Sequence, residues 1–298
     1  MAVDVLVTGA TGKLGKLVVP RLIDAGKTVR VLTRRPQEAT DLWGDKVEVA
    51  RGDFADPATV KEAARSAQKL FLLSPISETL AAHQIAAIDA AKAAGVTRIV
   101  KISGSDWTLQ NTDRSISGGA HAAVEAHLAA SGIAHAILRP NAWMQVSLAP
   151  VIAAANRGED LPSRYGNAAV SYIDAQDIAD VAIQALLDDL ISSVPLVLTG
   201  GEALTSLEVA RIAARIFQRP IGISDASSAA LPPHLGAFER RAIGEFIELI
   251  GAGLAAPVTQ SVSRITGKPP RTVEDFLHSH LGSIRTQTHG SKGEQTWH

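Results

Sequence analysis

The sequence has no cysteine, few aromatic residues and no long apolar run, and each absence excludes a class of protein. Without cysteine the chain has no disulfide, no thiolate nucleophile and no cysteine-ligated zinc, and it fits a reducing compartment. No stretch reaches the roughly 18 uninterrupted apolar residues of a membrane-spanning helix, and the N-terminus opens on a strand pattern rather than on a basic leader. We therefore expect a cytoplasmic protein with no membrane partner.

An excess of positive charge is also lacking. The 29 Lys and Arg residues balance 30 Asp and Glu residues, which leaves a net charge of −1. Proteins that bind nucleic acid by neutralising phosphates carry a basic surface, so no nucleic-acid partner is expected. The 298 residues are 46% hydrophobic and 20% charged, which is typical of a globular chain with one large unit or a domain and an appendage.

Short β-branched apolar runs alternate with alanine-rich segments of helical period through the first half of the chain. This alternation is typical of a parallel sheet between two layers of helices. We predict an α/β fold with a Rossmann-like doubly wound parallel sheet, whose ligand site lies at the carboxyl ends of its strands. The predicted strands are residues 3–7, 28–33, 47–50, 70–73, 98–102 and 134–138, and the later helices lie near 57–66, 79–94 and 118–131.

The pattern is looser beyond about residue 140. It predicts helices near 145–156, over 175–187 and from 205, with strands at 170–173 and 196–198. Proline pairs interrupt a largely helical region from about 203 to 282. We therefore divide the chain into a Rossmann domain over residues 1–150, a segment over 151–282 that completes the sheet and forms a helical substrate lid, and a polar tail over 283–298.

Three evenly spaced glycines stand between the first predicted strand and the first predicted helix. The first glycine permits a tight turn, the second lets backbone amides approach a pyrophosphate, and the third lets the helix lie close to the strand. The helix N-terminus then presents free N–H groups and the positive end of its dipole to the anion. A turn that binds no ligand is the alternative, but this context favours a dinucleotide. The segment reads Thr8-Gly9-Ala10-Thr11-Gly12-Lys13-Leu14-Gly15.

No acid follows the second predicted strand, which ends in Arg34 and Arg35. A carboxylate at this place binds the ribose 2′-hydroxyl of NAD, whereas an arginine can hold the 2′-phosphate of NADP. We therefore favour NADP(H), and NAD(H) stays possible because the two arginines can also be an ordinary solvated pair. Asp53 can accept the adenine amino group or serve as a turn residue or helix cap. Further cofactor contacts are predicted at Phe54, Ser74, Pro75, Ser103 and Pro140.

Several motifs together resemble the NmrA-like group of atypical short-chain dehydrogenase/reductases, over about residues 1–282. The resemblance implies a Rossmann domain, a small C-terminal substrate region and bound NAD(P)(H). It also implies one of several activities: reduction of quinones, dyes or phenolics, tailoring of bacterial aromatic polyketide antibiotics, or redox sensing without catalysis. The alanine-rich composition favours the polyketide branch. Besides the glycine segment, the motifs are Arg51-Gly52-Asp53, Leu138-Arg139-Pro140-Asn141, Tyr172-Ile173-Asp174-Ala175-Gln176-Asp177-Ile178-Ala179 and Thr266-Gly267-Lys268-Pro269-Pro270-Arg271-Thr272.

The Tyr-x-x-x-Lys pair of most short-chain dehydrogenases is absent from this sequence. The helix predicted over 118–131 instead places His121 on the same stripe as Val124 and Leu128, with Glu125 at its edge. An imidazole of ordinary pKa, about 6.5, can give up a proton at neutral pH, so His121 is a candidate proton donor. The resemblance supports this role, because phenolic reductases of the group carry a lysine there. A packed histidine bonded to backbone is the alternative, and Ser103 and Ser105 are further candidates.

Two of the four tryptophans follow predicted strands and therefore lie near the predicted ligand site. In a chain with only 4% aromatic residues, this placement favours a flat apolar wall for a planar ring system. The alternative is that both indoles fill the junction between the two parts of the chain. The candidate substrate-binding residues are Trp107, Asn141, Trp143, Met144 and, in the helical lid, Phe238.

These observations predict an NAD(P)H-dependent reductase of a planar aromatic or quinoid substrate, such as a quinone, a hydroxyanthraquinone tautomer or a conjugated ketone. Such electron-poor acceptors need little acid catalysis. A regulator that senses NADP(H), binds a partner protein and turns nothing over is the alternative. No metal site is expected, because His278 and His280 stand two apart on a predicted helix and do not face one another. The sequence leaves open whether the protein is a monomer or a homodimer.

Overall fold

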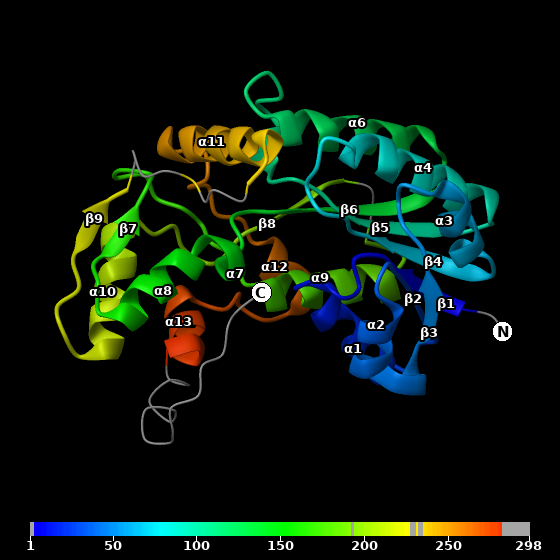
Figure 1. Cartoon of the computed structure of the whole chain (residues 1–298), viewed down its shortest axis with the longest axis horizontal. Coiled ribbons are helices and arrows are strands. Elements are labelled where there is room, and N and C mark those ends of the chain that lie inside the picture. The colour runs from blue at the N-terminus through cyan, green and yellow to red at the C-terminus, as the bar shows by residue number, and fades with distance from the viewer. Residues whose placement is uncertain (1–2, 192–193, 227–230, 232–234, 282–298) are drawn as a thin grey trace.

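A seven-stranded parallel sheet forms the centre of the protein (Figure 1). The computed structural model describes residues 3–191, 194–226, 231 and 235–281. The strand order is β3-β2-β1-β4-β5-β6-β8, so the order reverses between β1 and β4 and creates the crevice in which doubly wound sheets bind ligands. The strands are β1 (Val3–Val7), β2 (Val29–Thr33), β3 (Glu48–Arg51), β4 (Ala67–Leu72), β5 (Arg98–Ile102), β6 (Ala134–Pro140) and β8 (Leu196–Leu198).

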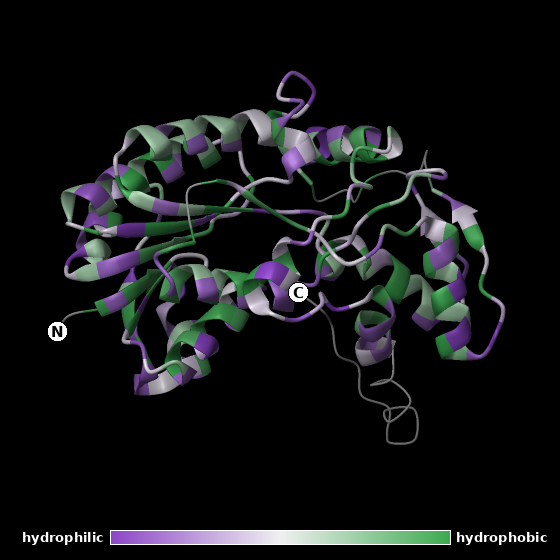
Figure 2. Cartoon of the chain, turned by 180° about the vertical axis from the view of Figure 1, so that it is seen from behind, coloured by the Kyte–Doolittle hydropathy of each residue, from purple (hydrophilic) through white to green (hydrophobic). Residues whose placement is uncertain are grey.

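Helices cover both faces of the sheet, as predicted for an α/β fold (Figure 1). One layer contains α1 (Gly15–Asp24), α2 (Pro36–Trp43), α9 (Ala175–Leu187) and α12 (Ser261–Thr266). The other contains α3 (Pro57–Ala64), α4 (Leu80–Ala93) and α6 (Ile116–Ala130). Hydrophilic and hydrophobic residues alternate along these helices (Figure 2), because each buries only one side against the strands.

A second group of elements packs around its own apolar cluster beside the sheet (Figure 1). It consists of α7 (Met144–Ser147), α8 (Ala149–Arg157), β7 (Leu161–Ser163), α10 (Ser206–Phe217), β9 (Ile223–Asp225), α11 (Ala237–Gly251) and α13 (Val273–Leu281). In the part of the chain that the structure describes, no helix combines the length and the apolar character needed to cross a membrane. The predicted tail over 283–298 lies outside the described residues.

Two predicted elements differ from the structure. The strand predicted at 170–173 is wrong, because this segment makes only two isolated pairings, Ile173 with Trp143 and Val170 with Leu204. The segment 170–173 therefore pairs with a different segment at each of its two ends, and neither pairing extends into a strand. The helix predicted near 145–156 is divided into α7 and α8, and Pro150 stands in the first turn of α8. Sequence analysis also missed α2, β7 and β9.

Asn141 joins the sheet to the second group of elements. It follows β6, is 4% exposed, and accepts a hydrogen bond from Trp107 Nε1 at 2.6 Å. Its amide nitrogen donates to the backbone oxygens of Ser171 and Ala255 at 3.0 and 2.8 Å, and to Ser171 Oγ at 2.6 Å. One buried side chain therefore connects three segments that are distant in the sequence.

We expect the substitution Asn141→Ala to lower the free energy of unfolding by about 2 to 4 kcal/mol, because it leaves buried donors and acceptors without partners. Urea denaturation followed by circular dichroism measures this change. The matched control is Asn167→Ala, which truncates an exposed asparagine and should have little effect. Equal stability of the two variants would contradict the role assigned to Asn141.

Candidate cofactor and catalytic site

The glycine segment forms a tight backbone turn between β1 and α1. Gly9 has a φ of +64°, which favours glycine. A Cβ atom added to Gly15 would lie 2.3 Å from the carbonyl oxygens of both Gly9 and Ala10, so only glycine lets α1 begin this close to the strand. The residues present thus fit the backbone cradle that a dinucleotide pyrophosphate requires.

A cavity of about 620 Å³ opens over this turn at the carboxyl ends of β1, β2 and β4. Its volume is within the ordinary range of cofactor sites. The cavity brings together most of the predicted cofactor residues: Gly9, Thr11, Gly12, Lys13, Leu14, Arg34, Arg35, Asp53, Phe54, Ser74 and Pro75. Sequence analysis missed Leu73, Thr79, His83 and, from the distant helix α11, Glu239.

The two arginines after β2 have different surroundings. Arg35 donates to Thr11 Oγ1 at 3.1 Å and pairs with Glu38 at 2.9 Å. The side chain of Arg34 is 73% exposed and lies 3.8 Å from the carboxylate of Asp53. Such a long and exposed ion pair contributes little to the stability of the fold. Arg34 can therefore turn toward an anion in the cavity at a small cost in free energy.

Four predicted cofactor residues do not line this cavity: Thr8, Gly15, Ser103 and Pro140. Thr8 is buried, and its hydroxyl accepts from the Leu73 amide at 2.9 Å and contacts the Leu73 carbonyl at 3.0 Å, which ties β1 to the end of β4. Gly15 packs under the turn, and Pro140 ends β6. Ser103 belongs to a separate polar network behind the ends of the strands.

That network contains Lys101, Ser103, His121 and Glu125, all of them buried. Lys101 Nζ lies 3.0 Å from both Ser103 Oγ and His121 Nδ1. Ser103 Oγ donates to Glu125 Oε1 at 2.5 Å. His121 therefore faces inward on α6, as its helical stripe predicted, but its partner is a lysine side chain rather than backbone. Sequence analysis did not consider Lys101, although a lysine inside the apolar run Ile99-Val100-Lys101-Ile102 was a signal.

Burial sets the charge states in this network. It lowers the pKa of Lys101 to about 7, although the Glu125 carboxylate acts in the opposite direction. Burial, and then the Lys101 charge, lower the pKa of His121 well below its ordinary value. Arg139 on β6 forms ion pairs with both Glu125 and Asp106. Its positive charge therefore balances the negative charge of the buried Glu125 carboxylate. His121 is thus a neutral imidazole at neutral pH.

The candidate substrate residues occupy four kinds of position. Trp107 and Met144 belong to the buried apolar cluster, where Trp107 makes an edge-on contact with Phe246 at 5.6 Å. Asn141 makes its hydrogen bonds to protein groups, and Ser105 Oγ donates to the Pro140 carbonyl at 2.8 Å. Trp143 lines the large cavity. Phe238 lies partly exposed in the first turn of α11, beside the cavity-lining Glu239.

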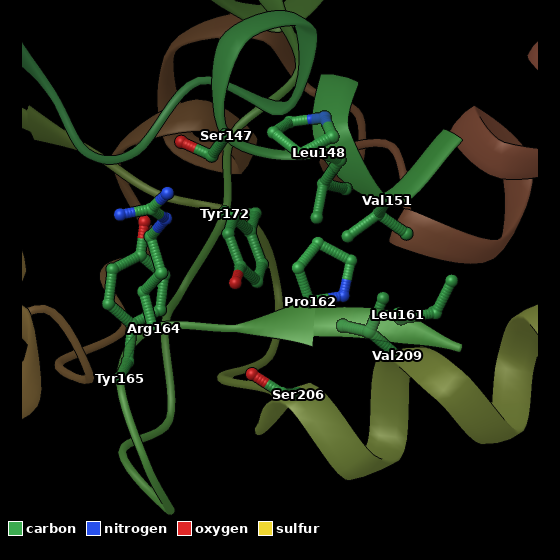
Figure 3. A pocket seen from close by; sticks show the side chains of 11 residues that line it. Ser147, Leu148, Val151, Leu161, Pro162, Arg164, Tyr165, Tyr172, Ser206 and Val209 are labelled. Carbon is green, nitrogen blue, oxygen red and sulfur yellow. The ribbon is translucent and has the colours of Figure 1, made fainter. Parts of the chain in front are cut away.

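A smaller cavity of about 60 Å³ lies in the second group, between α7, β7 and α10 (Figure 3). Around its central Tyr172, the polar side chains of Ser147, Arg164 and Tyr165 gather on one side (Figure 3). Apolar side chains, among them Leu148 and Val151, gather on the other. Burial raises the pKa of Tyr172, so its phenol stays protonated and remains a hydrogen-bond donor.

Comparison with known proteins places the chain among NAD(P)H-binding proteins. A family model for NAD(P)H-binding proteins matches residues 9–189. A (4-alkanoyl-5-oxo-2,5-dihydrofuran-3-yl)methyl phosphate reductase of Streptomyces griseus is 33% identical over 93% of this chain and 97% of its own length. An NAD(P)H azoreductase of Xenophilus azovorans is 30% identical over 94% of this chain and 99% of its own length.

Solved structures agree with this fold. The NADPH complex of a quinone oxidoreductase from Escherichia coli has a TM-score of 0.82 at 23% identity, and covers 93% of this chain and 99% of that chain. Nmra, a negative transcriptional regulator, has a TM-score of 0.81 at 15% identity, and covers 98% of this chain and 99% of that chain. These comparisons confirm the predicted Rossmann-like fold and the predicted binding of NAD(P)H, and the chain belongs to this family of NAD(P)H-binding proteins.

Proposed function

We propose that the protein is an NADPH-dependent reductase of planar, electron-poor substrates of the quinone type. The observation that carries this proposal is the position of Trp143, which presents the only tryptophan side chain among the described residues that line the large cavity. An indole beside a coenzyme site offers a flat apolar surface to a conjugated ring. The azoreductase and the dihydrofuran phosphate reductase among the relatives support a conjugated acceptor.

Each part of the site has a separate task in this reaction. The bound coenzyme supplies a hydride. The glycine turn and the N-terminus of α1 hold its diphosphate, and Arg34 binds the 2′-phosphate. Trp143 orients the ring of the substrate, and His121 supplies the proton that the reduced substrate takes up. A quinone needs only this modest assistance, since its reduced anion is delocalised.

The smaller cavity gives the substrate room for a substituent. Trp143 borders the large cavity and Ser147 borders the small one, and only the single turn of α7 lies between them. Four helical residues extend about 6 Å, so we propose that a short apolar group of a substrate held against Trp143 occupies the smaller cavity. This arrangement fits hydroxyanthraquinone tautomers and other tailoring substrates of aromatic polyketide antibiotic biosynthesis, which we propose as the substrate class.

For the coenzyme, we expect Arg34→Ala to weaken NADPH binding about 10- to 100-fold, because a charge-assisted hydrogen bond to the 2′-phosphate is lost. NADH binding should not change. Isothermal titration calorimetry with both coenzymes measures the dissociation constants, and Arg65→Ala serves as the control at an equally exposed arginine. Equal constants for both coenzymes in wild type and in Arg34→Ala would refute the preference for NADPH.

For the substrate, we expect NADPH absorbance at 340 nm to fall when the protein is mixed with hydroxyanthraquinones or naphthoquinones. The reason is that these acceptors match the flat Trp143 surface and need little acid catalysis. A saturated ketone of similar size is the control and should react much more slowly. Tight NADPH binding without any consumption across the panel would instead support a sensing regulator.

A further inference from the structure

A lysine with no solvent exposure stands on a central strand of the sheet, and among the described residues no carboxylate forms an ion pair with it. Lys101 lies on β5 and is 0% exposed, and its hydrogen-bond partners are Ser103, the Ile102 carbonyl and His121. Burying an ammonium group is costly unless it is compensated. Lys101 contacts the candidate proton donor His121 directly. A role that acts through His121 would explain why the chain keeps a buried ammonium group at this position despite its cost in free energy.

We propose that Lys101 is the positioning residue of the catalytic site: it holds His121 with Nδ1 as acceptor and Nε2 as donor, and replaces the proton that His121 gives to the reduced substrate. This inference rests on the proposed reductase function and names the group that makes His121 competent. In effect, a lysine on strand β5 supports an imidazole on helix α6.

The hydrogen-bond donors and acceptors of the two side chains fix the direction of the bond between Lys101 and His121. An ammonium group has three donors and no acceptor. Lys101 Nζ lies 3.0 Å from Nδ1 of His121, so a protonated Lys101 requires that nitrogen to accept. In a neutral imidazole the other nitrogen, Nε2, then carries the hydrogen. Lys101 thus selects one tautomer of His121.

The opposite edge of the imidazole faces the loop after β5. A Cβ atom added to Gly104 would lie 2.9 Å from Cδ2 of His121, the ring atom bonded to Nε2. Gly104 follows the carboxyl end of β5, and ligands of doubly wound sheets bind outside these strand ends. His121 is 5% exposed and therefore buried. The Nδ1 edge of its ring is held by Lys101, and the Cδ2 atom faces Gly104 in the loop after β5.

The surrounding charges suit Lys101 to exchange a proton near neutral pH. Glu125 from α6 raises the pKa of Lys101, whereas Arg139 from β6 and burial lower it, to about 7. Asp106 from α5 (Asp106–Leu109) lies beyond Arg139 and pairs with it at 2.6 Å. His121 stays neutral because burial and Lys101 lower its pKa. The pair therefore holds one exchangeable proton, which resides on Lys101 below about pH 7.

The proton transfer is balanced within the pair and the solvent. As the reduced substrate anion takes the proton from Nε2 of His121, the Nε2–H bond breaks and a substrate O–H or C–H bond forms. The Nζ–H proton of Lys101 moves to Nδ1, which leaves a neutral imidazole and a neutral amine. After product release, Nε2 takes a proton from water and Nδ1 returns its proton to Lys101.

Nitrogen-15 NMR of histidine-labelled protein tests the positioning without any substrate. Comparison with His121→Gln identifies the His121 signals among the nine histidines. At pH 6 we expect Nδ1 unprotonated and Nε2 protonated in the wild type, and a higher His121 pKa in Lys101→Met, because the neighbouring charge is gone. Lys92→Met, at an exposed lysine, is the control and should match the wild type. A protonated Nδ1 in the wild type at pH 6 would overturn the proposal, whether or not the protein reduces quinones.

Steady-state kinetics with the quinone tests the proton delivery. In the wild type, kcat should fall as pH rises through about 7, because Lys101 loses its proton. In Lys101→Met, kcat should drop about 10- to 100-fold with KM nearly unchanged, and this fall with pH should disappear. A pH profile that keeps the same fall in Lys101→Met would overturn the role of Lys101 while leaving the reductase function intact.

Gly104→Ala provides a second variant that keeps Lys101 in place. The added methyl group would crowd the His121 ring and Thr108 Oγ1, at 2.9 and 3.0 Å, and should displace the ring from its hydrogen-bonding position beside Lys101. We expect altered His121 nitrogen signals and a loss of kcat. The control is Gly119→Ala on α6, where the nearest atom would be 3.7 Å away. Wild-type His121 signals and wild-type kcat in Gly104→Ala would contradict the placement of the ring.

Discussion

The close approach of α1 to the end of β1 is the constraint on which the coenzyme site depends. Gly15 lies against the carbonyl groups of Gly9 and Ala10, at a distance that excludes any side chain. This contact fixes where the first helix begins and therefore where its unpaired N–H groups point. Thr8 adds a second restraint, because its hydroxyl bonds to Leu73 across the point where the strand order reverses. The part of the cavity at the glycine turn is therefore shaped by backbone.

Charge compensation shapes the other half of the site. Glu125 accepts from Ser103 and pairs with Arg139, which also pairs with Asp106, so a chain of alternating charges runs from α6 to α5. Lys101 and His121 stand at the inner end of this chain, and both are buried. Such a buried network keeps a defined geometry only while every member has a partner. The sequence separation of its members, from residue 101 to residue 139, shows that β5, α5, α6 and β6 must pack correctly before the network exists.

Much of the fold followed from local patterns. The glycine spacing located the coenzyme turn, and the β-branched runs located the strands from β1 to β6, because a buried parallel strand leaves a continuous apolar signature. The inward face of His121 followed from helical periodicity. Contacts between distant segments were not predictable in this way. No local signal connects Glu239 to the glycine turn, and none shows that Trp107 meets Asn141 while Trp143 turns to the cavity. Lys101 is the exception, since a charge in a buried strand was visible in the sequence.

The side chain of Asn141 has a consequence for how the two parts of the protein move. A hinge motion that opened the second group away from the sheet would stretch the hydrogen bonds from Asn141 to Ser171 and Ala255 together. In a partly opened interface the Asn141 amide would therefore have no well-placed acceptor. The interface is therefore rigid up to the point at which it breaks. Opening the second group away from the sheet would cost several buried hydrogen bonds at once.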